Sequence, residues 1–365
     1  MGTTISAAQP MGRLVFVGTY TKGESRGIYA FRFDEARGVL APGGLAAETP
    51  NPSFLVVSSD GRFLFAVNEV ADYEGARSGS VTSFAIDRQG GRLQQLSIRS
   101  SRGADPCHLA LDGTGKYLAV ANYSSGNVAV LPVAADGRLG PAVTVVQHEG
   151  RGADPARQGG PHAHQVVFSA DNRFLVVADL GLDQLVVYRF DPSAGTLTRH
   201  DPPAVSMPAG AGPRHFVFHP DGTRAFAINE LASTITSLSW DGRAGVFRSG
   251  PSVSTLPADF KGRSFTAEIQ VHPNGGFLYG SNRGHDSVAV FAVETGGRLS
   301  FVQAEPTRGK APRHFTIVPG GRWLIAANQG SGSLSVFAID AQAGRLAPVG
   351  PPVPAPTPVC VLLLR

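Results

Sequence analysis

The chain of 365 residues contains 45 glycines and 27 prolines, and only 16% of its residues are charged, so its composition argues against a helix-rich protein and suits a chain with many turns. Its formal net charge of +4 comes from Lys and Arg residues that form no long runs, so nucleic-acid binding is not expected, although the mild basicity would attract an anionic ligand. The chain has no apolar stretch of about 18 residues, which excludes a membrane-spanning helix.

The first twelve residues have neither the charged nor the apolar segment of a signal peptide, and we expect residues 1–12 to be disordered. The two cysteines, Cys107 and Cys360, are far apart in sequence and lack the spacing of metal ligands, which favours a reducing compartment. We therefore expect a cytoplasmic protein. Its single domain, residues 13–365, begins with three apolar strands in succession within "RLVFVGTYTKGESRGIYAFRFDEARGVL".

The chain then repeats one pattern six times. A short apolar strand leads through a turn of the Asp-Gly, Asn-Gly or Gly-Gly type into a second apolar strand, as in "NPSFLVVSSDGRFLFAVNE" and "GPRHFVFHPDGTRAFAINE". Alternating residues bounded by such turns predict a β-hairpin. The second strand of each repeat ends at Asn or Asp, namely Asn68, Asn122, Asp179, Asn229, Asn282 and Asn328.

Two more strands complete each repeat. A loop leads into a third strand, for example "SVTSFAID" or "SVAVFAVE", and a turn that ends in Gly leads into a short fourth strand. In the second repeat we expect this fourth strand to include "GRLG" at residues 137–140. Four antiparallel strands in each of several repeats are typical of β-propeller blades.

The two ends of the chain complete the count. The N-terminal segment supplies the second, third and fourth strands of a blade, and the C-terminal "PTPVCVLLLR" resembles a first strand. Pairing this last strand with the first three would close the ring and remove its open edge. We therefore predict an all-β protein, a seven-bladed β-propeller with four antiparallel strands per blade. An open β-solenoid is the alternative.

Charged side chains gather at one predicted end of the channel. The first strand of each blade lines the channel of a propeller, and the hairpin returns the end of the second strand to the same mouth. Charges at such a mouth are partly desolvated and must pair or bind a ligand. The residues expected to converge on one arc of the mouth are His164, Arg214, Glu230, Glu268 and Arg283.

The stretch Pro-Arg-His-Phe occurs twice, at residues 213–216 and 312–315, so Arg214 and Arg313 should occupy equivalent positions in two blades. Because successive strand residues point to opposite faces, we do not expect Arg214 and His215 to face the channel together. An alternative for the strand-start histidines is that they hydrogen-bond neighbouring blades and stabilise the ring. The histidines concerned are His108, His215 and His314.

The motifs "PHAHQ", "GPRHFVFHPDG", "SNRGHDSVAVF" and "APRHF" resemble those of the bacterial lactonase family of seven-bladed propellers, and the resemblance extends from about Arg13 to Leu364. This family contains propeller-type 6-phosphogluconolactonases and the fungal carboxy-cis,cis-muconate lactonizing enzyme. The resemblance implies a catalytic set of His164, Arg214, Glu230 and Arg283. We expect further substrate contacts from His162, His215, Glu268, Arg313, His314, Asn229 and Asn282.

The resemblance implies hydrolysis of an anionic sugar lactone, in the first place 6-phosphogluconolactone to 6-phosphogluconate of the pentose phosphate pathway. Either Glu230 or His164 would activate water while the other donates a proton, and Arg214 would stabilise the oxyanion. Arg283, together with Arg313, would hold a phosphate or carboxylate. The Glu, Asn and Asp ligands of metal-dependent sugar-lactone propellers are not found, so we expect neither a metal nor another cofactor.

Three other functions remain open at this point. The same acid–base pair could cyclise a carboxylated muconate, or the protein could hydrolyse a sugar lactone without a phosphate. A non-enzymatic scaffold would need exposed aromatic patches, whereas the aromatic residues here fall inside the predicted strands, which favours core packing. The sequence predicts no protein or membrane partner, and it does not predict an oligomeric state.

Overall fold

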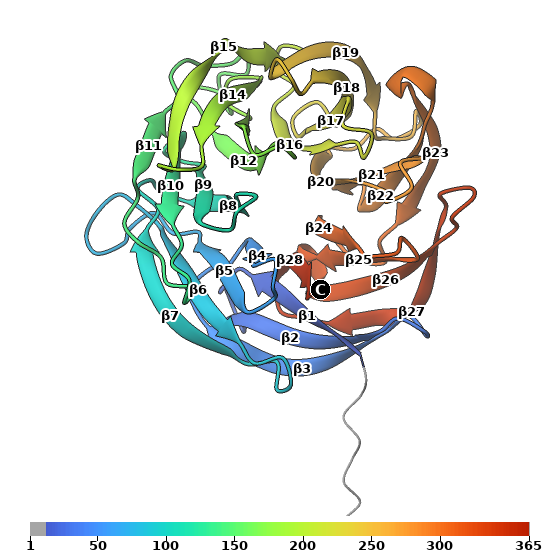
Figure 1. The fold of residues 1–365 in the computed structure, drawn as a ribbon. Helices are drawn as coiled ribbons and strands as arrows, with labels where there is room; N and C mark the ends of the chain where they lie inside the picture. The colour runs from blue at the N-terminus through green and yellow to red at the C-terminus, as the bar shows by residue number, and fades with distance from the viewer. Residues whose placement is uncertain (1–11, 365) are drawn as a thin grey trace, which may run out of the picture.

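The computed structural model describes residues 12–364, and its strands form seven four-stranded antiparallel sheets arranged around a central channel (Figure 1). The prediction of a seven-bladed propeller is therefore confirmed. The helical segments of the described residues are two short 3-10 turns, Thr295–Gly297 and Gln329–Ser331. We expect residues 1–12 to be disordered, and residues 1–11 of this segment lie outside the described part of the chain.

The blades follow one another in chain order, and within each blade the strands run from the channel outward. Blade 1 contains β28 (Pro358–Leu363), β1 (Arg13–Thr19), β2 (Gly27–Asp34) and β3 (Val39–Glu48). Blade 2 contains β4 (Leu55–Val57), β5 (Phe63–Asn68), β6 (Ser80–Ile86) and β7 (Leu93–Ser100). Blade 3 contains β8 (Pro106–Leu111), β9 (Tyr117–Asn122), β10 (Asn127–Pro132) and β11 (Thr144–Gln147). Blade 4 contains β12 (Ala163–Phe168), β13 (Phe174–Asp179), β14 (Gln184–Asp191) and β15 (Thr196–Ser206).

The last three blades repeat the same order. Blade 5 contains β16 (Pro213–Phe218), β17 (Arg224–Asn229), β18 (Thr234–Asp241) and β19 (Val246–Ser254). Blade 6 contains β20 (Phe265–Val271), β21 (Phe277–Arg283), β22 (Ser287–Val293) and β23 (Leu299–Pro306). Blade 7 contains β24 (Pro312–Ile317), β25 (Trp323–Asn328), β26 (Ser333–Ile339) and β27 (Leu346–Pro354).

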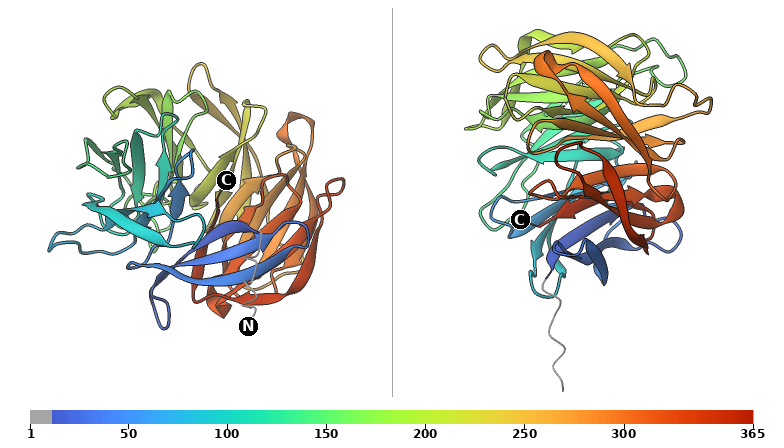
Figure 2. Two further views of the ribbon diagram at one scale, coloured as in Figure 1. Left: turned by 60° about the horizontal axis from the view of Figure 1, so that its bottom comes forward. Right: turned by 90° about the vertical axis from the view of Figure 1, so that its right-hand side faces the viewer.

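The C-terminal strand closes the ring, as predicted. β28 pairs antiparallel with β1, with Phe16 opposite Leu362 and Val17 opposite Val361, and the two ends of the ring lie side by side in Figure 1. Seen from the side in the right-hand view of Figure 2, the ring is a thick disc. Because the inner strand of blade 1 comes from the end of the chain, the ring closes only after the last residues have folded.

Apolar side chains between neighbouring blades form the core. Phe16, Leu64 and Phe84 pack between blades 1 and 2, and Phe174, Phe216 and Trp240 pack between blades 4 and 5. Fully burying a side chain of this size stabilises the fold by about 1.5–3 kcal/mol. Polar contacts add to this packing, since the imidazoles of His219 and His272 hydrogen-bond carbonyl groups in the next blade's hairpin turn.

The position predicted for the fourth strand of blade 3 was wrong. Leu139 forms only an isolated bridge with Val133, and the strand that pairs with β10 begins at Thr144. Pro141 lies between these two positions and has no N–H to donate to a strand ladder, which explains why regular pairing starts later.

Most inner strands contain a register shift near their start. In β16 it lies between Pro213 and His215, and in β24 between Pro312 and His314. Equivalent shifts occur in β8, β12 and β20. Such a bulge inserts an extra residue into the ladder and turns its side chain to a new direction, often beside a functional site.

Candidate active site

Side chains from blades 2 to 7 surround a cavity of about 310 Å³ at one mouth of the channel, which we call the mouth cavity. The inner strands supply some of its walls, and the residues that follow the second strands supply others, as the hairpin geometry predicts. The lining residues are Glu69, Cys107, Tyr123, Arg157, His164, Glu230, Phe265, Arg283 and Arg313.

Glu230 is the centre of an ion-pair network. Its carboxylate lies 2.8 Å from Arg157 Nη2, 2.8 Å from Arg283 Nη2 and 3.1 Å from Arg214 Nε. The N–H of Glu230 donates to the carbonyl of Gly212, which fixes the residue beside the start of β16. Burial alone would raise the pKa of this carboxyl, but the neighbouring guanidinium groups, Arg283 and Arg214 first, lower it to about 2.

The backbone of β20 holds two of these guanidinium groups. Arg214 Nη1 donates to the carbonyl of Ala267 at 2.8 Å, and Arg283 Nη2 donates to that of Thr266 at 2.8 Å. Burial, reinforced by the neighbouring Arg313 and Arg283, lowers the pKa of Arg214 to about 10, so this side chain remains charged at neutral pH. The donors are thus fixed in the folded protein before any ligand binds.

Another part of the wall of the mouth cavity consists of Arg313 and Glu69, which both contact Tyr20. The Arg313 guanidinium lies 5.2 Å from the centre of the Tyr20 ring, and the Tyr20 hydroxyl donates to Glu69 Oε1 at 2.8 Å. Within the described residues, Arg313 forms no ion pair. Four guanidinium groups therefore face the two carboxylates of Glu69 and Glu230, and the mouth carries a net positive charge that suits an anionic ligand.

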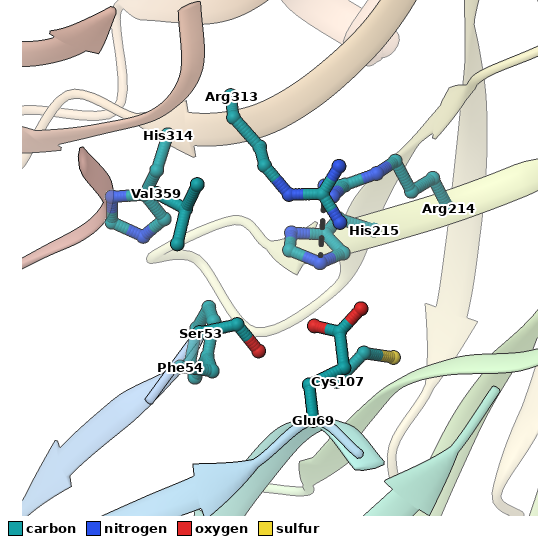
Figure 3. Close-up of a pocket in the computed structure, with 9 residues that line it drawn as sticks. All are labelled: Ser53, Phe54, Glu69, Cys107, Arg214, His215, Arg313, His314 and Val359. Carbon is teal, nitrogen blue, oxygen red and sulfur yellow. Dashed lines mark hydrogen bonds between the residues drawn. The ribbon is translucent and has the colours of Figure 1, made fainter. Parts of the chain in front are cut away.

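A second cavity, which we call the inner cavity, lies deeper in the channel and measures only about 10 Å³ (Figure 3). It shares Glu69, Cys107 and Arg313 with the mouth cavity, and both Arg214 and His215 line it. The expectation that these two neighbours would not face the channel together was wrong. The bulge between Pro213 and His215 turns both side chains to the same side, and Arg214 Nη1 lies 3.4 Å from His215 Nε2.

His164 is buried, and it lines the mouth cavity but not the inner cavity. Its Nδ1 forms no hydrogen bond within the described protein, and burial together with the positive charge of Arg214 lowers its pKa well below the ordinary histidine value. The imidazole is therefore neutral at pH 7 in the unliganded protein. His162 stacks on Tyr123 at a centroid distance of 4.5 Å, and Tyr123 in turn contacts His164 at 5.6 Å. His162 thus reaches the cavity through Tyr123.

Rings from four blades pack across the channel, where some of them line the inner cavity, and form a plug. Phe54 lies 4.0 Å from His108 and 5.6 Å from His314, and His215 lies 5.3 Å from His108. Glu268 belongs to this layer, because its Oε2 is 3.0 Å from His215 Nδ1 and 3.6 Å from His314 Nε2. Burial raises the pKa of the Glu268 carboxyl.

Two roles were considered for the strand-start histidines, contact with the substrate and hydrogen bonds between neighbouring blades, and the plug is relevant to both. Val361 of β28 donates to His314 Nδ1 at 3.2 Å, which ties the closing strand to blade 7. His215 and His314 also line the inner cavity, whereas Glu268 is among the lining residues of neither cavity. Glu268 therefore lies one layer deeper than the predicted position at the channel mouth.

Asn229 and Asn282 lie inside their blades. Asn229 Nδ2 donates to the hydroxyls of Thr234 and Thr236, and Asn282 Nδ2 donates to the carbonyl of Thr255 and the hydroxyl of Ser287. Both side chains are fully buried, and neither lines a cavity at the mouth. Their contacts are those of residues that end a strand and hold the next loop.

Five residues that line the mouth cavity were not among the predicted site residues, namely Glu69, Cys107, Tyr123, Arg157 and Phe265. Glu69 and Tyr123 directly follow strand-ending Asn residues, as Glu230 does, so the same positional argument applies to them. Burial raises the pKa of the Cys107 thiol, which donates to the carbonyl of His164, so it is a poor nucleophile. Arg157 had no repeat-based signal because it belongs to the loop of residues 148–162.

This loop is anchored at both ends and in its middle. His148 Nδ1 lies 2.6 Å from Asp179 Oδ2, and Asp179 Oδ1 accepts a hydrogen bond from the His162 N–H. Gln158 is fully buried and donates to the carbonyl of Leu180 and to Asp183 Oδ1. The loop therefore holds Arg157 in place over the mouth cavity.

Within residues 12–364, no group of three His, Cys, Asp or Glu side chains is arranged to hold a metal ion. The expectation of a metal-free site stays a prediction. A search of the same residues finds no helix of the length and apolar character needed to cross a bilayer.

Comparison with known proteins agrees with this architecture. A family described as "Lactonase, 7-bladed beta-propeller" matches residues 14–363. A 6-phosphogluconolactonase of Bacillus subtilis (strain 168) is 38% identical over 351 residues, which cover 96% of this chain and 98% of that protein. The solved structure of a periplasmic gluconolactonase of Pseudomonas aeruginosa is similar, with a TM-score of 0.91 at 39% identity, and the match covers 97% of this chain and 99% of that one. The chain therefore belongs to the lactonase family of seven-bladed β-propellers.

Proposed function

We propose that this protein hydrolyses a phosphorylated sugar lactone, 6-phosphogluconolactone, to 6-phosphogluconate. The observation that carries the proposal is the excess of guanidinium over carboxylate groups around the mouth cavity, because a phosphate ester is a strong anion that Arg binds well. The relative from Bacillus subtilis carries the name of this enzyme. A cavity of about 310 Å³ also lies within the range of small-molecule sites.

In the proposed complex the phosphate lies at the outer rim, beside Arg157 and Arg283, and the lactone carbonyl lies deeper, beside Arg214. Negative charge develops on the carbonyl oxygen when water attacks, and a fixed guanidinium that faces this oxygen lowers the barrier. Arg313, which has no carboxylate partner in the described residues, completes the cationic wall.

Glu230 and His164 take different roles in this proposal. With a pKa of about 2, the Glu230 carboxylate has little tendency to accept a proton, and we assign it to holding the arginines in position. His164 is neutral in the free protein, but a bound phosphate dianion would offset the field of the arginines and raise its pKa. We assign His164 as the acid that protonates the leaving ring oxygen.

The proposed reaction uses no metal, since the guanidinium groups supply the electrophile. Hydrolysis of a non-phosphorylated sugar lactone is the second candidate, favoured by the similarity to the Pseudomonas aeruginosa gluconolactonase. That protein is periplasmic by name, whereas a phosphorylated substrate and the two unpaired cysteines fit the cytoplasm. The named relatives act on gluconolactones, which favours lactone hydrolysis over cyclisation of a muconate.

A panel of lactones tests the proposal. The purified protein is assayed with 6-phosphogluconolactone, gluconolactone, rhamnonolactone and muconolactone, with carboxymuconate as a substrate for ring closure, and spontaneous hydrolysis is subtracted. We expect the highest kcat/KM for the phosphorylated lactone, with activity unchanged by EDTA. Equal or higher kcat/KM for gluconolactone would favour the second candidate, and loss of activity with EDTA would refute the metal-free mechanism.

A further inference from the structure

The mouth of the channel contains a carboxylate for which the proposed function gives no role, that of Glu69. It lines both the mouth cavity and the inner cavity. Glu230 forms three ion pairs, and the Glu268 carboxylate lies beside His215 and His314. Among residues 12–364, Glu69 has no basic side chain within 4.0 Å of its carboxylate. A carboxylate that is not neutralised by an ion pair keeps its lone pairs available for a proton.

The protein fixes Glu69 in place from three sides. Its N–H donates to the carbonyl of Asn51 at 3.0 Å, and its carbonyl accepts a hydrogen bond from Asn51 Nδ2 at 3.0 Å. The Tyr20 hydroxyl donates to Oε1 at 2.8 Å. The other carboxylate oxygen, Oε2, is buried and forms no hydrogen bond within the described protein.

One more buried polar atom without a hydrogen bond belongs to a residue that lines the inner cavity, Ser53 Oγ. In Figure 3 the Ser53 hydroxyl and the Glu69 carboxylate point toward the middle of the cavity, below the Arg313 guanidinium. A volume of about 10 Å³ has room for one water molecule, which in proteins typically makes about three hydrogen bonds. The cavity therefore has the size and the polar lining of a site for a single water.

We propose that the inner cavity binds the hydrolytic water and that Glu69 is the base that removes its proton. This inference rests on the proposed lactone hydrolysis and names the group that activates water in it. The inner cavity borders the mouth cavity through Glu69 and Arg313, so a water there lies next to the position assigned to the lactone carbonyl. His164, which lines the mouth cavity but not the inner cavity, is left to protonate the leaving oxygen.

The proposed step balances. The water oxygen forms a bond to the carbonyl carbon while Glu69 Oε2 takes one of its protons and the carbonyl π electrons move to oxygen, beside Arg214. The tetrahedral intermediate then re-forms the C=O bond and breaks the bond to the ring oxygen, which takes a proton from His164. The product is a hydroxy acid, and solvent afterwards removes the proton from Glu69 and returns one to His164.

The test is the isosteric variant Glu69→Gln, whose amide oxygen can still accept from Tyr20. We expect kcat to fall by about 10²–10⁴-fold, the usual contribution of a general base, while the Kd of 6-phosphogluconate measured by calorimetry changes by less than about threefold. The matched control is Glu74→Gln, an exposed glutamate in the same loop, which should keep wild-type kcat. In a second variant, Glu69→Ala, added formate should restore part of the lost turnover.

Wild-type kcat in Glu69→Gln would overturn the assignment. So would equal losses of turnover and product binding, or a Glu69→Ala variant that formate does not rescue, since a merely structural role predicts those results. The failure of the proposed substrate is distinguishable, because it shows in the wild type. If the wild type hydrolyses gluconolactone but not the phosphorylated lactone, the same variants are assayed on gluconolactone, and the Glu69 assignment is decided there.

Discussion

The arginine side chains at the mouth fall into two groups that differ in how firmly the protein holds them. All three arginines pair with Glu230, but Arg214 and Arg283 are also held by backbone carbonyls of β20, whereas Arg157 is about one third exposed and lies on a loop. The tied groups suit stabilisation of a transition state, because they need no reorganisation. The looser group suits recognition of a peripheral phosphate.

We expect Arg214→Ala to lower kcat by about 10²–10³-fold, because loss of one donor to an oxyanion raises the barrier by roughly 3–4 kcal/mol. Steady-state kinetics on the phosphorylated lactone measures the effect, and circular dichroism at matched concentration checks that the variant is folded. A folded Arg214→Ala protein with normal turnover would show that the oxyanion lies elsewhere.

We expect Arg157→Gln to weaken recognition of the phosphate. KM for 6-phosphogluconolactone should rise by about 10-fold or more, since a charge-assisted hydrogen bond contributes roughly 1.5–3 kcal/mol. The kcat/KM for gluconolactone should stay within about threefold of wild type and serves as the internal control. Equal losses on both lactones would place the phosphate away from Arg157.

The residues at the mouth were predictable only where the repeat carried the information. Arg214, Glu230 and Arg283 occupy fixed positions of the blade, so alignment of the repeats was enough to bring them together. Arg157 lies in a loop without a counterpart in other blades, and its contact with Glu230 depends on the buried side chain of Gln158. No periodic pattern encodes such a contact.

At the scale of elements, the bulge at the start of the inner strands and the loop of residues 148–162 set the geometry of the site. Strict alternation along β16, which we predicted, would have placed Arg214 and His215 on opposite faces. A bulge depends on how the ladder pairs across the hairpin, which the sequence of one strand does not reveal. The strand pairs were thus predictable, but the direction of these side chains was not.

The loop also supports a prediction. Gln158→Ala removes the two donors that hold the loop to Leu180 and Asp183, and each buried acceptor left without its partner costs about 1–3 kcal/mol. We expect faster cleavage of this loop in limited proteolysis and a rise in KM for the phosphorylated lactone similar to that of Arg157→Gln. An unchanged cleavage rate, or a KM equal to that of wild type, would mean that other contacts hold the loop.

At the scale of the whole molecule, the channel contains buried histidines whose neutral form is favoured by folding. Burial lowers the pKa of His108, His164 and His215 well below the ordinary value, and it lowers that of His314 to about 4. In the unfolded chain each would titrate near 6.5. Below that pH the unfolded state therefore binds more protons than the native state, so acidification destabilises the fold.

We therefore expect the free energy of unfolding to be nearly flat above about pH 7 and to fall below about pH 6.5, by roughly 1.4 kcal/mol per pH unit for each such histidine. Glu268, whose pKa burial raises, acts in the opposite sense but is a single group. Unfolding by guanidinium chloride at a series of pH values measures the slope of the free energy of unfolding against pH. The variant His108→Gln should reduce this slope by the equivalent of about one proton. A curve that stays flat to pH 5.5 would refute this account.

Ring closure was predictable because an unpaired strand at each end of the sequence leaves few topologies. The plug of Phe54, His108, His215 and His314 was not, since it joins residues from four blades through the centre of the ring. This plug has a kinetic consequence. With one end of the channel blocked, reactant and product must share a single entrance, so the acid formed has to diffuse out before the next lactone can enter. Accumulated product should accordingly act as a competitive inhibitor, and the rate of its escape sets an upper limit on turnover.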